Sequence, residues 1–440
     1  MSLDLKPISD TPFFIPDYRQ NISMVVPSAL MCLDQDLGRR SLFDLPQTKQ
    51  VLEDNNCMDA EIVIVILVDT LGYTKLQAIS KKLLNVYQKL DCFQLSSTCP
   101  TITSTCLMSI HTGLTPCEHG IVGHKIYIPE YDNIIDFLKM SPIDIKTRDS
   151  LMKSGVNYRS LSWKPSLYDL MNRDLIAHLG LVHHRILDTG LSNLLVDPKI
   201  RTDIGYANLI DLFAKAKKII KKKKRIQQSK LLLNIYTGYL DELSHLYGPN
   251  SPEYDAGFHY FEIRFLEFVK SLEKEGLSKK TTLFLLSDHG QVPLDPNKII
   301  AFTQDELKYV KRFIKRPGRS GRAIHIYVKP EFLEEAEDFF RNFIAEKGEV
   351  FRFSDVVDFL GCSYSVNINT ERLQERFGDL IIFLKKGYHM ELPKPRKRGK
   401  DWLDSLMETE IKLGSHGSLT FDELVVPCIA SNASEIARII

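Results

Sequence analysis

The sequence lacks the marks of several large classes of protein. Its longest strongly apolar run is IVIVILV at residues 62–68, far below the roughly 20 residues that a membrane-spanning helix needs. Residues 1–20 contain Asp and Pro and no basic segment followed by an apolar run, so they do not form a secretory signal. We therefore expect a soluble, cytoplasmic protein without a membrane partner.

Closely spaced cysteine pairs are also absent. None of the 8 cysteines belongs to a CxxC pair, which argues against a zinc ribbon and against a thioredoxin-like site. We expect all eight to be small buried apolar side chains in a reducing compartment.

Neither sign of charge dominates. The chain has 57 Lys and Arg against 56 Asp and Glu, a net charge of +1, so net charge gives no argument for a nucleic-acid partner. Two local basic runs, at 215–225 and 394–400, leave that question open. The first contains no aromatic residue of the kind that stacks on single-stranded nucleic acid, and a solvated helix face explains it more simply.

What the sequence does contain is an alternation of strand and helix patterns. Apolar residues at helical spacing predict helices at 208–225 and 254–275. Apolar runs of strand length lie at 62–68, 231–237, 282–286, 323–328, 379–384 and 423–429. Such runs between helices are typical of an α/β fold with a mostly parallel central sheet and helices on both faces.

We interpret residues 1–440 as a single domain with insertions, one of the arrangements that this length allows. The expected core comprises residues of about 55–125, 205–300 and 405–435. The expected insertions are about 126–205 and 300–405.

Metal-binding types of side chain follow several of the expected strands. In an open α/β sheet, ligands bind beyond the carboxyl ends of the strands. Taken singly, each of these residues is explained by a helix cap or a turn. Together they indicate one site, because several separate element ends present them: Asp69, Thr103, Asp241, His245, Asp288, His289 and His416.

The chemistry of this set is self-consistent. Three carboxylates and three imidazoles suit two divalent ions such as Zn²⁺, with Mn²⁺ as an alternative. Asp241 and His245 are four residues apart, so on a helix they share one face. Two ions, three carboxylates and one deprotonated hydroxyl sum to about zero charge, and such a site accepts an anionic phosphate. Two ions ~4 Å apart stabilise both oxygens of an in-line displacement.

Thr103 has the context of a nucleophile. It follows Pro100, and we expect it at the N-cap of a helical pattern at 104–112, where free backbone N–H groups face an anion. A metal ion lowers the pKa of such a hydroxyl. Thr101, Ser104 and Thr105 are rival hydroxyls.

Five segments that carry these residues occur in a fixed order: VILVDTLGY, PTITSTCLMSIHTGLTPCEHGIVGH, YLDELSHLYGP, LLSDHGQV and GSHGSLTFDELVVP. They resemble the successive motifs of the alkaline phosphatase superfamily, and within it the type I phosphodiesterase/nucleotide pyrophosphatase group. The resemblance extends from about Tyr18 to Ile429. The last segment also resembles the PglZ-type domains of that superfamily, which are linked to phage defence and signalling.

The resemblance implies an alkaline phosphatase-like three-layer sandwich and a metal-dependent hydrolase of phosphodiester or pyrophosphate bonds in nucleotide-type substrates. It places Asp69, Thr103, Asp288 and His289 around one ion. It places Asp241, His245 and His416 around the other. The nucleophile of such enzymes forms a covalent phospho- or nucleotidyl-enzyme, which water then hydrolyses.

The sequence departs from this pattern at two positions. His124 stands where the eukaryotic nucleotide pyrophosphatases have an Asn that binds a phosphoryl oxygen, and Ser244 stands where a Gly is usual. Further candidates for substrate contact are Arg319, Arg322 and His325, because Arg side chains suit phosphate oxygens.

Other activities remain open at this stage. A phosphomonoesterase or a phosphomutase would use the same site, and a PglZ-like defence or signalling component would keep the fold. No Arg lies between Pro100 and Gly123, so we expect diesters to be preferred over monoester dianions, which usually need an added cation. Aromatic residues that could contact a leaving group are Tyr127, Tyr131, Trp163 and Tyr168.

Overall fold

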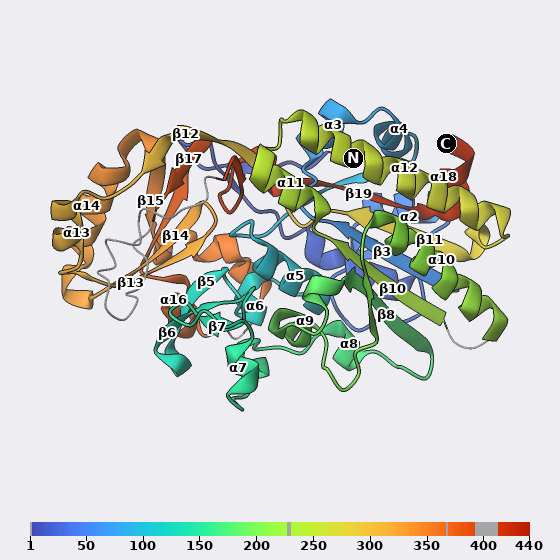
Figure 1. Ribbon diagram of the computed structural model, residues 1–440, viewed down its shortest axis with the longest axis horizontal. Coiled ribbons are helices and arrows are strands. Elements are labelled where there is room, and N and C mark those ends of the chain that lie inside the picture. Colours follow the sequence, from blue (N-terminus) through green and yellow to red (C-terminus); the bar gives the residue numbers. More distant parts are fainter. Residues whose placement is uncertain (1, 227–229, 367, 392–411) are drawn as a thin grey trace.

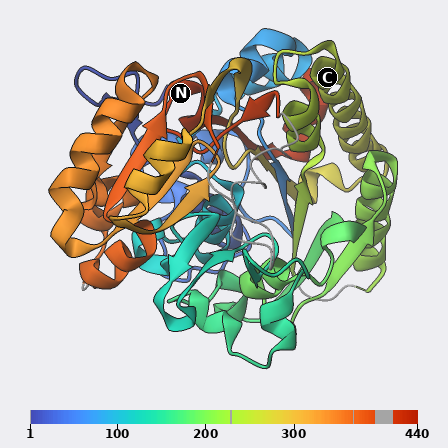
Figure 2. The same cartoon turned by 60° about the vertical axis from the view of Figure 1, so that its left-hand side comes forward.

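The computed structural model describes residues 2–226, 230–366, 368–391 and 412–440. These residues form two seven-stranded sheets, a three-stranded sheet and a two-stranded one. Figure 1 shows the larger α/β part on the right and the second large sheet with its helices on the left. Figure 2 shows the same two parts from another side, with the elements coloured orange coming forward.

The main sheet is mostly parallel, as expected. Its spatial order is β4 (Phe93–Ser96), β19 (Val425–Asn432), β11 (Thr281–Leu286), β3 (Ile62–Val68), β10 (Lys230–Thr237), β8 (Ile176–His183) and β9 (Asp203–Tyr206). Only β19 runs antiparallel to its neighbours, β11 and β4. Strands β8 and β9 extend this sheet, although they lie largely within the segment 126–205 that the sequence suggested as an insertion.

Helices cover both faces of the main sheet because its central strands are apolar on both sides. In β3, Ile62, Ile64 and Ile66 pack with α4 (Lys82–Lys89), α10 (Leu209–Ile226), α12 (Pro252–Lys274) and α18 (Ala433–Ile439). The alternate residues Val63, Val65 and Leu67 pack toward α1 (Val25–Met31), α5 (Thr103–Thr112) and α9 (Gly190–Leu195). The period of two in the strand thus produces the three layers. The predicted helices at 208–225 and 254–275 are confirmed as α10 and α12.

The second large sheet is antiparallel. Its order is β15 (Gly348–Arg352), β16 (Leu380–Leu384), β14 (Ala323–Val328), β13 (Ile314–Ser320), β5 (Lys125–Ile128), β6 (Asn133–Asp136) and β7 (Ser141–Pro142). Two predicted strands, at 323–328 and 379–384, therefore form but belong to this sheet. Helices α13 (Gln304–Val310) and α14 (Leu333–Ile344) cover one of its faces.

A three-stranded sheet of β17 (Gly387–Met390), β12 (Val292–Ile300) and β18 (Gly414–Ser415) joins the two parts. Strand β12 follows β11 of the main sheet, and β18 precedes β19. The segments that carry Asp288, His289 and His416 therefore meet where the two parts of the molecule join.

Two cysteines differ from the expectation. Cys117, on α6 (Pro116–His119), forms a disulfide with Cys362, and their Cα atoms are 5.3 Å apart. The prediction of eight reduced cysteines is wrong for this pair, because its members are 245 positions apart and no spacing pattern links them. The other six are buried and free.

The basic run at 215–225 has acidic neighbours. Lys215 pairs with Asp211 at 2.8 Å and Lys221 with Glu275 at 2.6 Å, so part of its charge is matched within the fold. The run at 394–400 lies outside the described residues. None of the helices in the described part of the chain combines the length and apolar content that crossing a bilayer requires.

Candidate active site

Two strand ends bring the first three candidate ligands together. Asp69 follows β3, and Thr70 after it adopts a left-handed backbone with φ of 65°, which turns the chain away from the sheet. Asp288 and His289 follow the neighbouring strand β11. The Asp288 carboxylate accepts hydrogen bonds from the N–H groups of His289 at 2.9 Å and of Thr70 at 3.3 Å. These hydrogen bonds link the segment after β3 to the segment after β11.

Asp69, Asp288 and His289 form one group of potential ligands. The Nε2 atom of His289 lies 3.6 Å from Oδ1 of Asp69 and 3.4 Å from Oδ2 of Asp288. All three side chains are buried. Those two carboxylate oxygens accept no hydrogen bond from any described residue, and a buried anion left in that way is costly. A cation bound between the three side chains would remove that cost.

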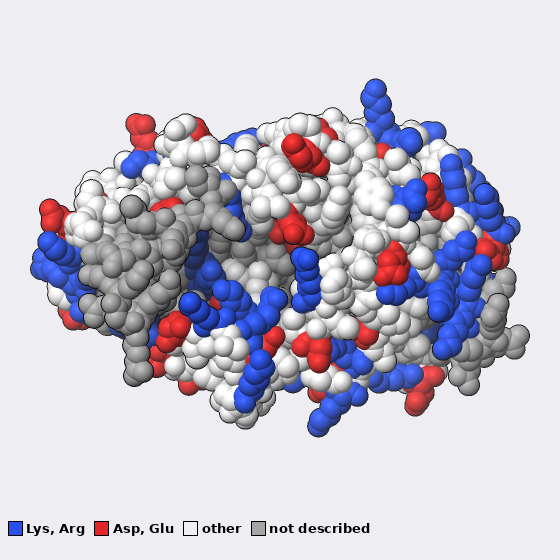
Figure 3. Space-filling view, viewed as in Figure 1, with Lys and Arg blue, Asp and Glu red and all other residues white. Residues whose placement is uncertain are grey.

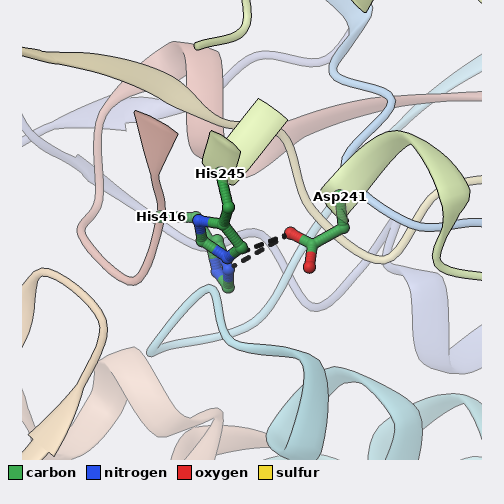
Figure 4. Close-up of side chains that lie close together, drawn as sticks. All are labelled: Asp241, His245 and His416. Atoms are coloured by element: carbon green, nitrogen blue, oxygen red, sulfur yellow. Dashed lines mark ion pairs between the residues drawn. The ribbon is translucent and has the colours of Figure 1, made fainter. Parts of the chain in front are cut away.

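Asp241, His245 and His416 form a second group. Helix α11 (Tyr239–Tyr247) carries the first two on one face, one turn apart. The Nε2 atom of His245 lies 3.3 Å from Oδ1 of Asp241, and that of His416 lies 3.7 Å from the same oxygen. Figure 4 shows both rings turned toward the Asp241 carboxylate. The rings of His416 and His289 stack at 3.9 Å, so the two groups adjoin.

Each imidazole is oriented by a backbone carbonyl. The Nδ1 atoms of His245, His289 and His416 lie 2.7, 3.1 and 2.9 Å from the carbonyl oxygens of Gly414, Gly290 and Thr101. An Nδ1–H that donates to a carbonyl leaves Nε2 as the ligand atom, the usual arrangement around bound metals. In both groups it is Nε2 that faces the carboxylates.

The electrostatics of the site favour bound cations. Burial raises the pKa of Asp69 well above its usual range, and the negative charges of Asp288 and Asp241 raise it further. Burial lowers the pKa of His416 well below its usual value. Neutral imidazoles and crowded carboxylates are the donors that Zn²⁺ and Mn²⁺ accept. The residues present therefore fit two divalent ions, one in each group.

Thr103 lies beside the first group. Its Oγ1 is 3.2 Å from Nε2 of His289, and it is the first residue of α5, after the N-cap residue Ile102. Two rival hydroxyls are engaged elsewhere: Thr101 donates to the carbonyl of Ser418 at 2.7 Å and Ser104 to that of Gly123 at 3.0 Å. Thr105, the third rival, is fully buried.

The predicted substrate contacts have other partners. Arg322 is fully buried, 3.1 Å from the Glu423 carboxylate. His325 is buried between Ser320, at 2.7 Å, and the carbonyl of Phe377, at 2.8 Å. Both side chains thus have partners within the fold and are not offered as substrate contacts.

Arg319 and His124 are the other two predicted substrate contacts. Arg319 is half-buried, and its Nε donates to the carbonyl of Gly321 at 2.9 Å. The Nε2 of His124 is 3.7 Å from Asp136, and burial lowers its pKa to about 4. The charges of Arg319 and Lys412 also lower the pKa of His124, and Lys412 acts likewise on both histidines of the second group. Positive charge therefore gathers beside the site.

Sequence reasoning missed two residues that support the ligands. The hydroxyl of Tyr236, on β10, donates to Oδ2 of Asp69 at 2.5 Å. Glu423 bonds to the loops of both His289 and His416: its carbonyl accepts from the Gly290 N–H at 2.9 Å and its carboxylate from the Ser418 N–H at 3.1 Å. Tyr236 sits on the strand that ends just before α11, the only sequence signal that could have drawn attention to it.

A cavity of about 650 Å³ opens beside Thr103 and Asp69. It extends between β8 and β10 on one side and α5 and α9 on the other. Two aromatic residues that the sequence suggested as substrate contacts are placed differently. Trp163 stacks its ring against Arg376, 4.7 Å from the ring centre. Tyr168 is fully buried and bonds to His111 and Asn234, which line the cavity.

Solved structures share this architecture. Murine ectonucleotide pyrophosphatase/phosphodiesterase 5 aligns with 84% of this chain and 87% of its own, at 14% identity and a TM-score of 0.58. Phosphonoacetate hydrolase from Sinorhizobium meliloti aligns with 87% of this chain and 96% of its own, at 16% identity and a TM-score of 0.54. At these identities the likeness shows the alkaline phosphatase-like fold.

Sequence comparison gives the family. An uncharacterized pyrophosphatase/phosphodiesterase of Schizosaccharomyces pombe is 33% identical over 69 residues, which are 16% of this chain and 14% of that protein. The chain thus matches only a small part of this relative. The model of the type I phosphodiesterase / nucleotide pyrophosphatase family matches residues 63–419. That match spans most of the chain and every candidate ligand, and the protein belongs to the type I phosphodiesterase / nucleotide pyrophosphatase family.

Proposed function

We propose that the protein hydrolyses phosphodiester or pyrophosphate bonds, in nucleotide-type substrates, with Thr103 as the nucleophile at a two-metal centre. The observation that carries this proposal is the convergence of unpaired carboxylate oxygens and three Nε2 atoms beside the Thr103 hydroxyl. Asp69, Asp288 and His289 would hold one ion. Asp241, His245 and His416 would hold the other, and Zn²⁺ or Mn²⁺ suits both sets.

When bound, the ions would lower the pKa of the Thr103 hydroxyl and neutralise charge that develops on the phosphoryl oxygens. Oγ1 of Thr103 attacks phosphorus in line with the departing oxygen. The bond from phosphorus to that oxygen breaks, and a phosphoryl or nucleotidyl ester forms on Thr103. Water then attacks phosphorus, the bond to Oγ1 breaks, and Thr103 is restored.

The helix that begins at Thr103 supports this role. The first N–H groups of a helix have no partner within it and attract anions. Because Thr103 is the first residue of α5, a phosphoryl oxygen on Oγ1 lies next to those groups. The hydroxyl and the helix terminus thus act on the same phosphate.

Positive charge beside the site supports an anionic substrate. Figure 3 shows Lys and Arg side chains around a hollow near the middle of one face. The charge of Lys412 acts on His245 and His416, and the charges of Lys412 and Arg319 act on His124. Arg322 is held by Glu423 and does not add to them. We infer that one of the two groups esterified to the phosphate lies near Lys412 and Arg319, the positively charged rim of the site, and that this group is a nucleotide.

Metal content and activity test the proposal together. Purified protein should hold close to two divalent ions, and Asp288→Ala and His416→Ala should each lose one ion and most hydrolysis of bis-nitrophenyl phosphate. Glu53→Gln, in an exposed pair with Lys49, serves as the control and should lose neither. Full metal content and activity in both ligand variants would contradict the proposal.

A further inference from the structure

Much of the buried lining of the cavity beside Thr103 is aliphatic. Its buried lining includes Val65, Leu67, Leu107, Ile110, Leu191 and Leu195, from β3, α5 and α9. Protein interiors are normally packed as densely as organic crystals. A space of about 650 Å³ between a sheet and its helices leaves these side chains without contact atoms on one side, and such a space weakens packing. An apolar occupant would supply the missing contacts.

Several polar groups of the wall bond to one another, whereas Oδ1 of Asn234 and Nδ1 of His178 have no hydrogen-bond partner among the described residues. The amide nitrogen of Asn234 lies 2.7 Å from the Tyr168 hydroxyl and 2.8 Å from Nε2 of His178. The same hydroxyl lies 2.6 Å from Nδ1 of His111. Burial lowers the pKa of His111 to about 4 and that of His178 to about 3. Both imidazoles are therefore neutral at pH 7, and this part of the wall carries no charge.

The six Asp, Glu and Arg side chains of the lining differ in exposure. Arg148, Arg185 and Glu242 are exposed. Asp203 lies 3.3 Å from Arg201, so its charge is matched. Thr103 and the proposed ligands Asp69 and Asp241 also line the cavity. The cavity thus combines the proposed reactive residues, an uncharged aliphatic part and exposed charged side chains.

We propose that this cavity takes a hydrocarbon arm of the substrate, so that the protein acts on phosphodiesters or pyrophosphates of an aliphatic alcohol. The inference rests on the proposed function, because it uses Thr103 to define where the phosphate lies. A polar or anionic arm then lies on the positively charged rim, and the substrate is amphiphilic. A straight alkyl chain and a branched isoprenoid chain share this chemistry.

A series of 4-nitrophenyl phosphodiesters with methyl, hexyl, geranyl or thymidine-5′-yl as the second arm tests this directly. All release the same nitrophenolate, so differences in kcat/KM report the second arm. Each buried methylene contributes up to about fourfold, which corresponds to ~0.8 kcal/mol. The hexyl ester should exceed the methyl ester by about 30-fold or more, and the ratio of geranyl to hexyl distinguishes the two chain types. A hexyl-to-methyl ratio below about threefold, or a preference for the thymidine ester over the hexyl ester, overturns the proposal.

Two variants four positions apart locate the effect. Leu191→Trp fills the cavity and should lower the hexyl-to-methyl ratio at least about tenfold. Leu187→Trp makes the same change at a side chain that is 36% exposed and outside the lining, and it should retain the ratio. Leu191→Asn, which adds no bulk, gives a second test if the Trp variant does not fold. An unchanged hexyl-to-methyl ratio in the folded Leu191 variants would mean that the hydrocarbon arm binds outside this cavity, and it overturns the proposal.

Calorimetric binding of decyl phosphate separates this inference from the proposed hydrolysis. Suppose that no ester is cleaved, but decyl phosphate binds one to one and Leu191→Trp raises its dissociation constant at least about tenfold. The proposed hydrolysis is then wrong and the cavity assignment holds. If decyl phosphate does not bind and chain length has no effect, the cavity assignment is wrong even when bis-nitrophenyl phosphate is cleaved.

Discussion

The buried ion pair between Arg322 and Glu423 should stabilise the junction between the two parts of the molecule, where the site lies. Both side chains are fully buried and lie 3.1 Å apart. The backbone N–H of Arg322 donates to the carbonyl of His416 at 2.8 Å, and Glu423 accepts from Gly290 and Ser418. The pair therefore links β14 of the second sheet to the loops that carry His289 and His416.

We expect Glu423→Gln to lower the free energy of unfolding by about 3–5 kcal/mol, because it leaves the Arg322 charge buried without a counter-charge. Arg322→Met should cost a similar amount, since it leaves the carboxylate unpaired. The double variant removes both charges and keeps an oxygen that accepts from Ser418. Its loss should be smaller than the sum of the single losses by at least about 1.5 kcal/mol.

Urea titrations of the four proteins measure these losses, and metal analysis of the folded variants shows whether ions are retained. Glu53→Gln is the matched control, because its pair with Lys49 is about half exposed and is worth at most about 1 kcal/mol. Single variants within about 1 kcal/mol of wild type, or strictly additive losses, would refute the argument that this pair matters through its buried charge.

Four further outcomes are expected. Thr103→Ala should lower kcat by several orders of magnitude, whereas Ser104→Ala should retain much of it. Release of nitrophenolate from bis-nitrophenyl phosphate measures both, and a larger loss in Ser104→Ala would assign the nucleophile to Ser104. Tyr236→Phe should cost about 10–100-fold in metal affinity or activity, because Asp69 loses the hydroxyl that orients it; unchanged affinity and rate would argue against that role. Bis-nitrophenyl phosphate should have a higher kcat/KM than nitrophenyl phosphate, because Arg322 is paired with Glu423 and does not stabilise a monoester dianion; a clear preference for the monoester would contradict this reasoning. Burial lowers the pKa of His119 to about 3, so as the pH falls the unfolded chain takes up the proton before the folded protein does. The free energy of unfolding should therefore fall below about pH 6.5, by about 2.7 kcal/mol at pH 4.5. In urea titrations across that pH range His119→Gln should show a shallower decline than wild type, and parallel curves would contradict this role of His119.

The residues proposed to do chemistry were accessible from the sequence because each lies in, or directly beside, the last or first turn of a regular element. Asp69 and Asp288 follow strands of continuous apolar residues, and Asp241 and His245 have helical spacing. Parallel strands end at one edge of a sheet, so strand order along the chain already predicts that such residues meet. The helices α10 and α12 and the parallel core were predictable for the same reason, since their periodicity is local.

The supporting contacts were not accessible, because they join segments that no local pattern relates. Cys117 and Cys362 are 245 positions apart, and Tyr236 reaches Asp69 only because β10 lies beside β3. The sequence could not tell that Arg322 points inward to Glu423 instead of toward a phosphate, since an Arg in a strand has the same pattern in either case. The cavity likewise depends on how closely α5 and α9 approach the sheet. Local sequence thus determined which residues stand at the element ends, and the packing of distant segments decided which side chains support them and what space lies beside them.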